Sequence, residues 1–205
     1  MARHQEYATA APLGYMGLGM ATVLLGLHNA QLVPPGAAVV AMGLVCGGVM
    51  QFCAGMLEYG TGNTFGLTAF VALGAFWLSF VVLACLPQWG LASDPAPVLL
   101  GRYMWVWAVF AAILAAGSLV ASRVHQIVFF SLAVQFVLLG CAGVFARPVL
   151  MVVGGYAGLL CGIGAIYLAA AAVLEAQFDR PVLPTGLPSA PAPRAGHDEL
   201  LVQLS

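Results

Sequence analysis

Six long apolar stretches, separated by short polar joints, occupy most of the 205-residue chain. A helix that crosses a bilayer needs about 20 mostly apolar residues. Charges and clusters of Pro and Gly divide the sequence into stretches of that length at 13–32, 36–59, 64–86, 98–120, 124–145 and 149–176. These runs are almost continuously apolar, whereas the strands of outer-membrane barrels alternate apolar and polar residues. The sequence therefore predicts an all-α integral membrane protein with six transmembrane helices.

The scarcity of charge excludes several classes of function. Charged residues make up 6% of the chain, against about 25% in average soluble domains. A net charge of −1 provides no basic face for nucleic acid, and the sequence contains no Lys for catalysis. It also lacks the Gly-x-Ser-x-Gly and His-Glu-x-x-His motifs, and its five cysteines are scattered singly. We expect no enzyme activity, no cofactor, no metal site and no nucleic-acid partner.

The chain divides into an N-terminal segment (1–12), a six-helix transmembrane domain (13–177) and a flexible Pro-rich C-terminal tail (178–205). Six spans place both termini on the same side of the membrane. That side would hold four of the six Arg residues, so the positive-inside rule predicts cytoplasmic termini. We expect a multi-pass protein of a bacterial or archaeal plasma membrane.

Polar side chains inside the spans are candidates for function, because they are costly in lipid. Both glutamates of the spans, Glu58 and Glu175, lie near span ends, where a capping role is a plausible alternative to a functional one. A proton pump would carry several carboxylates near mid-membrane. Six residues are the candidates for lining a pathway or binding its substrate: Thr22, Asn29, Gln51, Glu58, Asn63 and Thr64.

One segment is distinctive beyond its composition. The run Gly62-Asn63-Thr64-Phe65-Gly66 interrupts two apolar helices and predicts a tight or re-entrant turn. Together with the Phe76-Trp77-Leu78-Ser79 that follows, it resembles the acetate uptake transporter family, whose bacterial members are the succinate–acetate permeases. Other spans agree, and the resemblance covers roughly residues 10–185, with further motifs at Ala11-Pro12-Leu13-Gly14, Leu27-His28-Asn29, Phe129-Phe130-Ser131-Leu132 and Ala165-Ile166-Tyr167-Leu168.

The resemblance implies a six-helix subunit that assembles as a hexamer, with a pathway for acetate and related small carboxylates through each subunit. It also implies a hydrophobic constriction made by a Phe, a Tyr and a Leu from three helices. The motifs place that constriction at Leu18, Leu73 and Leu132 here. Only Leu132 keeps the family residue, so the expected waist lacks both aromatic rings and a hydroxyl.

Elementary chemistry is consistent with this function. Small carboxylates have a pKa of about 4 and are almost fully ionised at neutral pH. An anion that leaves water needs hydrogen-bond donors, and the Gln51 and Asn63 amides and the Thr22 and Thr64 hydroxyls are the expected ones. A channel for small neutral solutes such as urea, ammonia or water is the alternative, because an uncharged apolar pore suits it equally. A non-transporting membrane subunit is a third possibility.

Glycines on the last span indicate close helix contacts. Gly154, Gly158 and Gly162 recur every fourth residue and make one flat helical stripe. Packing within one subunit is the first interpretation of this stripe, and a contact between subunits is the second.

Overall fold

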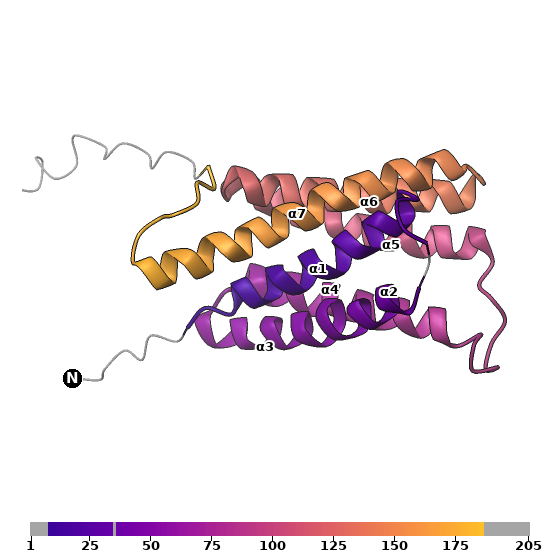
Figure 1. Ribbon diagram of the computed structural model, residues 1–205, viewed down its shortest axis with the longest axis horizontal. Helices are drawn as coiled ribbons and strands as arrows, with labels where there is room; N and C mark the ends of the chain where they lie inside the picture. Colours follow the sequence, from indigo (N-terminus) through magenta and orange to yellow (C-terminus); the bar gives the residue numbers. More distant parts are fainter. Residues whose placement is uncertain (1–7, 35, 187–205) are drawn as a thin grey trace, which may run out of the picture.

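The computed structural model describes residues 8–34 and 36–186, and within them the chain is all-helical. The helices run roughly along the long axis of a single bundle (Figure 1). Their bounds are α1 (Ala11–Asn29), α2 (Ala37–Met42), the π-helix η1 (Gly43–Met50), α3 (Gln51–Thr61), α4 (Thr64–Cys85), α5 (Pro97–Gly117), the 3₁₀-helix η2 (Ser118–Val120), α6 (Arg123–Val144) and α7 (Pro148–Phe178).

The described chain has six helical segments that are long and apolar enough to cross a membrane, which confirms the predicted number. The second span, Ala37–Thr61, is composite, because α2, η1 and α3 continue one another. The expected spans agree with the observed helices to within a few residues at most ends. The C-terminal tail lies outside the described residues from position 187 onward.

The helix ends follow local sequence chemistry. Proline stands in the first turn of α1, α5 and α7, where its missing N–H costs no helical hydrogen bond. Ser122 caps α6 by accepting a hydrogen bond from the backbone N–H of His125. Between α3 and α4, Gly62 has a φ of +73° and Asn63 caps α4 through Gly66. The predicted turn is therefore tight, and the chain passes straight from one span into the next.

Glycines allow the helices to approach one another closely. A Cβ added at Gly162 would lie 2.8 Å from the backbone nitrogen of Val23 on α1, and one at Gly158 would meet Gln135 on α6. Gly154 packs against Leu138 and Leu139 of α6. The stripe on α7 thus makes contacts within the subunit, as its first interpretation predicted. The most extensive helix contacts are α1 with α7, α5 with α6, and α6 with α7.

The π-helix in the second span has a matching partner on α4. Cβ atoms added at Gly43 and Gly47 would lie 2.9 and 2.5 Å from the Trp77 ring, so two glycines of the wide turn form the bed for that indole. On the other side, the Cys46 carbonyl approaches Gly17 of α1. Wide turns of this kind are rare and often lie near functional sites.

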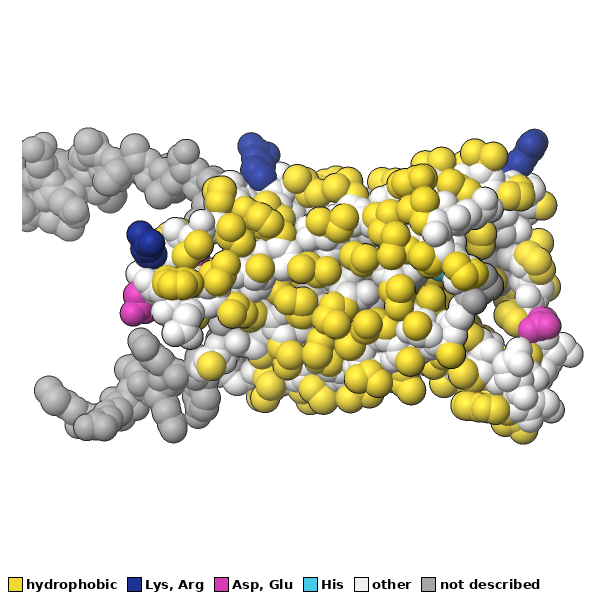
Figure 2. Space-filling view, in the orientation of Figure 1, with side chains coloured by type: hydrophobic (Ala, Val, Ile, Leu, Met, Phe, Trp, Pro, Cys, Tyr) yellow, Lys and Arg dark blue, Asp and Glu magenta, His cyan; other side chains and the backbone are white. Residues whose placement is uncertain are grey.

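The outer surface is apolar along the length of the bundle. Figure 2 shows charged side chains only near the two ends of the visible face, with hydrophobic side chains covering the region between them. Strongly exposed apolar residues lie on three different helices, for example Leu57 on α3, Val106 on α5 and Ile163 on α7. This distribution suits a protein surrounded by lipid and apolar partners.

Candidate transport pathway

Three leucines from three helices meet in the middle of the bundle. Leu18 of α1, Leu73 of α4 and Leu132 of α6 are 1–3% exposed and line one central cavity of about 10 Å³. That volume holds about one water molecule, so the passage is closed here. The residues predicted to form the constriction therefore lie together, although they are distant in the sequence.

A polar layer lies one helical turn beyond this leucine ring. Thr22 of α1 and Gln135 of α6 line the same cavity and are 2% and 3% exposed. Thr22 was a predicted pathway residue, whereas Gln135 was not. Its position three residues after Leu132 on the same helix is the signal that could have identified it, because residues i and i+3 share a helix face. Among the described residues that line the cavity, none is charged.

A wide apolar vestibule adjoins the cavity on the side away from the chain termini. It has a volume of about 520 Å³ and shares Leu25, Met104 and Leu139 with the central cavity. Asn29, at the end of α1, is 6% exposed and contributes an amide to its wall. A solute entering from this side would therefore meet the polar layer before the leucine ring. We name the space the apolar vestibule.

An aromatic layer lies on the opposite side of the leucine ring. Tyr15, Phe70 and Phe129 each precede one of the three leucines by three residues, and all three are buried. The Tyr15 ring lies edge-on to the other two, with ring centroids 5.0 Å from Phe70 and 6.5 Å from Phe129. The aromatic groups missing from the leucine ring are thus present one turn nearer to the termini.

The predicted residues Glu58, Asn63 and Thr64 lie at the terminal end of the bundle. The buried Glu58 carboxylate accepts hydrogen bonds from the Ala10 backbone N–H, at 3.0 Å, and from the Asn63 side-chain amide. Asn63 also accepts from Gly66 N–H. Ala10 is followed by α1 and Asn63 by α4, so the pair ties together the first turns of two helices. About 10 Å of α1 separates this end from Leu18.

Gln51 has a different environment from the other predicted donors. It is the first residue after the π-helix, is 0% exposed, and its Oε1 and Nε2 atoms find no hydrogen-bond partner in the described protein. It lies against Gly17 of α1, next to Leu18. It does not line the central cavity. The π-helix thus delivers an unpaired amide to the layer of the leucine ring.

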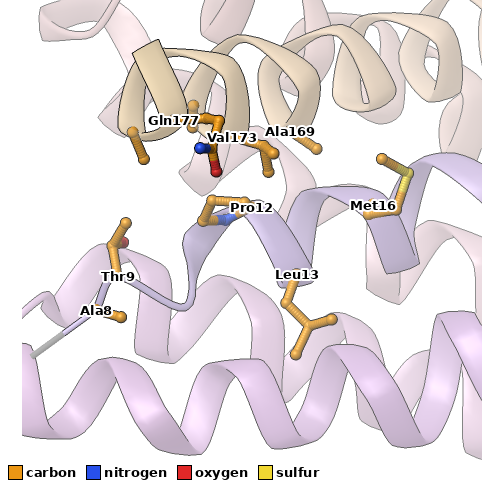
Figure 3. Close-up of a pocket in the computed structure, with 10 residues that line it drawn as sticks. Ala8, Thr9, Pro12, Leu13, Met16, Ala169, Val173 and Gln177 are labelled. Atoms are coloured by element: carbon orange, nitrogen blue, oxygen red, sulfur yellow. The ribbon is translucent and has the colours of Figure 1, made fainter. Parts of the chain in front are cut away.

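A further groove of about 590 Å³ lies between the first half of α1 and the last turns of α7. Its lining is mostly apolar, and Pro12 and Gln177 face each other across it (Figure 3). Met16 faces this groove, whereas Leu18 faces the central cavity. Two positions along a helix correspond to about 200° of rotation, so α1 itself separates the two spaces.

The described residues contain no group of three His, Cys, Asp or Glu side chains that could hold a metal ion. His125, the histidine nearest to the aromatic layer, hydrogen bonds to Ser122 and lies edge-on to Tyr15. The site therefore consists of layers of apolar and aromatic side chains with a few uncharged hydrogen-bonding groups between them.

Known proteins share both this sequence and this fold. The chain is 46% identical over 181 residues to the succinate-acetate/proton symporter SatP of Escherichia coli K12, an alignment that covers 88% of this chain and 96% of SatP. It is 33% identical over 181 residues to ammonia transport outward protein 2 of Saccharomyces cerevisiae, covering 84% of this chain and 64% of the yeast protein.

A solved structure, described as that of the bacterial acetate channel SatP, superimposes with a TM-score of 0.86 at 46% sequence identity and covers 88% of this chain and 100% of the solved chain. The model of the GPR1/FUN34/yaaH family matches residues 1–186. These similarities confirm the relationship that the motifs indicated. This multi-pass membrane protein therefore belongs to the GPR1/FUN34/yaaH family, the acetate uptake transporters.

Proposed function

We propose that this protein carries acetate and related small monocarboxylates across the membrane through a pathway within each subunit. The pathway runs from the apolar vestibule through the polar layer of Thr22 and Gln135, then through the leucine ring and the aromatic layer. The observation that carries the proposal is the convergence of Leu18, Leu73 and Leu132 on one cavity. The names of the relatives, a succinate-acetate symporter and an acetate channel, support the choice of substrate.

The physical properties of the ring suit a small monocarboxylic solute. Its apolar walls accept the methyl group of acetate, and the neighbouring hydroxyl and amide replace part of the hydration of the carboxyl group. A fixed positive charge would retain an anion and slow its release. Succinate carries two carboxyl groups and must lose more hydration at an apolar ring. Acetate is therefore the preferred substrate of the two.

Four finer features complete the proposal. The subunits form a homo-hexamer in the plasma membrane, with both termini in the cytoplasm. Residues 13–177 form the transport domain, between the N-terminal segment and the C-terminal tail. Gln51, Asn29 and Thr64 contribute donors along the route, and the unpaired amide of Gln51 supports its inclusion. The apolar faces of α3, α5 and α7 supply surface for contacts between subunits as well as with lipid.

Uptake by purified protein in liposomes tests the function. Radiolabelled acetate should enter faster than into protein-free vesicles, and urea at equal concentration should enter no faster than the background. The second candidate is a channel for neutral solutes, which the uncharged cavity lining and the yeast relative's name favour. Faster entry of urea or ammonia with background entry of acetate would replace the first function by the second.

The constriction itself has a separate test. Replacing Leu73 by Tyr should narrow the ring and slow butyrate more than acetate. Replacing Leu132 by Ala should widen it and bring the butyrate flux closer to the acetate flux. Val137→Ala, at an exposed position of α6, is the control. Equal effects of a substitution on both substrates would show that the size filter lies elsewhere.

A further inference from the structure

The side chain of Gln135 is polar, buried and short of partners. The residue is 3% exposed, and its Oε1 atom accepts no hydrogen bond from the described protein. An amide oxygen buried without a partner costs free energy comparable to a lost hydrogen bond. The other residues beside it in the cavity wall, such as Leu132, Phe136 and Leu139, are apolar. Packing alone would be served as well by Leu or Met at this position, so the amide calls for a ligand.

The neighbouring helix provides the space for this amide. A Cβ added at Gly158 of α7 would lie 2.8 Å from Gln135 Nε2 and 2.9 Å from its Cδ. Any residue larger than glycine would therefore displace the amide group. The absence of a side chain at Gly158 lets Gln135 take the position from which it lines the central cavity.

Thr22 is the other polar residue of this cavity wall and is 2% exposed. A hydroxyl both donates and accepts a hydrogen bond, and so does a primary amide. The cavity therefore presents donors and acceptors together, and no charged side chain among its described lining residues. A carboxylate only accepts hydrogen bonds, whereas a neutral carboxylic acid donates one and accepts others.

We infer that Gln135, together with Thr22, forms a binding site for the carboxyl group of the substrate on the vestibule side of the leucine ring, and that this site recognises the neutral acid. The inference rests on the proposed carboxylate transport. The Gln135 N–H donates to the acid C=O, and its Oε1 accepts from the acid O–H. The methyl group of the acid then points toward Leu18, Leu73 and Leu132.

The neutral acid is also the species that the ring passes at lower cost. At pH 7 about one carboxylate in 10³ is protonated, given a pKa of about 4. This population penalty is far smaller than the cost of moving an unpaired charge into an apolar interior. The proton is taken from water on one side and returned to water on the other, bound to the substrate. One proton accompanies each carboxylate, and no side chain of the protein changes its protonation.

Two substitutions move or remove the amide by different means. Gln135→Met keeps the length of the side chain without hydrogen bonds and should lower protein-dependent acetate uptake about three- to tenfold, the effect of one lost hydrogen bond. Gly158→Ala keeps Gln135 but displaces its flexible end, and should lower uptake by a similar factor. Gln177→Met, exposed on α7, and Gly164→Ala, which meets Val128 at 2.9 Å, are the matched controls.

Measurements on the unmodified protein test which form of the substrate is bound. Acetamide, which donates and accepts, should inhibit acetate uptake, whereas acetone, which only accepts, should not do so at equal concentration. A potential of about 100 mV, positive inside, would favour accumulation of an anion about 50-fold and should leave protein-dependent uptake unchanged within about twofold.

The outcomes separate this site from the general function. Absence of acetate uptake by the unmodified protein would overturn the proposed function itself. Normal uptake that Gln135→Met and Gly158→Ala leave at the level of their controls would overturn the site alone. Uptake that follows the membrane potential, or equal inhibition by acetamide and acetone, would overturn recognition of the neutral acid.

Discussion

Glu58 shows how a charged residue in an apolar protein can have a structural role. Its carboxylate is 1% exposed and bonds to the Ala10 N–H and the Asn63 amide. The first N–H groups of a helix lack partners within the helix and carry partial positive charge. A carboxylate that accepts from the residue preceding α1 therefore stabilises the start of that helix, and through Asn63 also the start of α4.

We predict that Glu58→Ala lowers the stability of the folded subunit. Breaking hydrogen bonds to a buried charge costs about 1.5–3 kcal/mol each, so the melting temperature in mild detergent should fall clearly. Glu175→Ala, at an exposed position of α7, should leave it unchanged. An unchanged melting temperature for Glu58→Ala with a reduced acetate flux would instead place Glu58 in the transport pathway.

At the scale of helices, the pathway is built by repetition along α1, α4 and α6. Each helix contributes an aromatic ring at one turn and a leucine at the next, and α1 and α6 add a polar group at the turn beyond. The three helices meet with these turns level, as the Tyr15, Phe70 and Phe129 rings show by their contacts. Residues three or four apart share a helix face, so one alignment of the helices brings all three layers together.

The aromatic layer leads to a prediction about selectivity. Tyr15→Leu should remove the ring that lies edge-on to Phe70 and Phe129 and leave an apolar side chain in its place. The flux ratio of butyrate to acetate in liposomes should rise severalfold if this layer restricts the route. Phe130→Leu, on the exposed side of α6, provides the comparison, and the same ratio in both variants would exclude the layer as a filter.

The π-helix depends on the absence of side chains at its contact with Trp77. Gly47→Ala would place a Cβ 2.5 Å from the Trp77 ring, and overpacking of this kind costs about 1–3 kcal/mol. We expect a lower melting temperature and less folded protein. Gly60→Ala in α3 meets nothing within 4 Å, and its better helix propensity should leave stability unchanged or slightly raised. Equal behaviour of the two variants would contradict this account of the contact.

For the whole molecule, the described structure places the start of α1 and the end of α7 at the same end of the bundle (Figure 1). The apolar vestibule opens at the other end, near Asn29 and Pro97. With cytoplasmic termini, the vestibule faces the outside of the cell, and a substrate entering the cell meets Gln135 first.

Cysteine labelling tests this orientation. In a variant without the native cysteines, Asp94→Cys, in the loop before α5, should react with a membrane-impermeant thiol reagent added to intact cells. Thr61→Cys, exposed at the turn between α3 and α4, should react only after the cells are opened. The reverse pattern would show that the termini lie outside the cytoplasm.

Sequence alone determined the spans, their number and the family. Span length and Pro or Gly at the joints are local properties, and the motifs identified the family that the comparisons confirm. The three leucines of the predicted constriction were also found in this way. Their role as a size filter stays a prediction, although the structure brings them to one cavity.

Only the tertiary structure decided which polar residues reach that cavity. A membrane helix is apolar toward lipid and toward its neighbours, so its sequence contains little amphipathic signal to indicate the inner face. Gln135 therefore looked like any amide within a span, and Glu58 like a pathway carboxylate as much as a cap. Gln51 owes its position to the π-helix before it. The packing of glycines against distant helices set the level and rotation of each span, and with them the arrangement of the site.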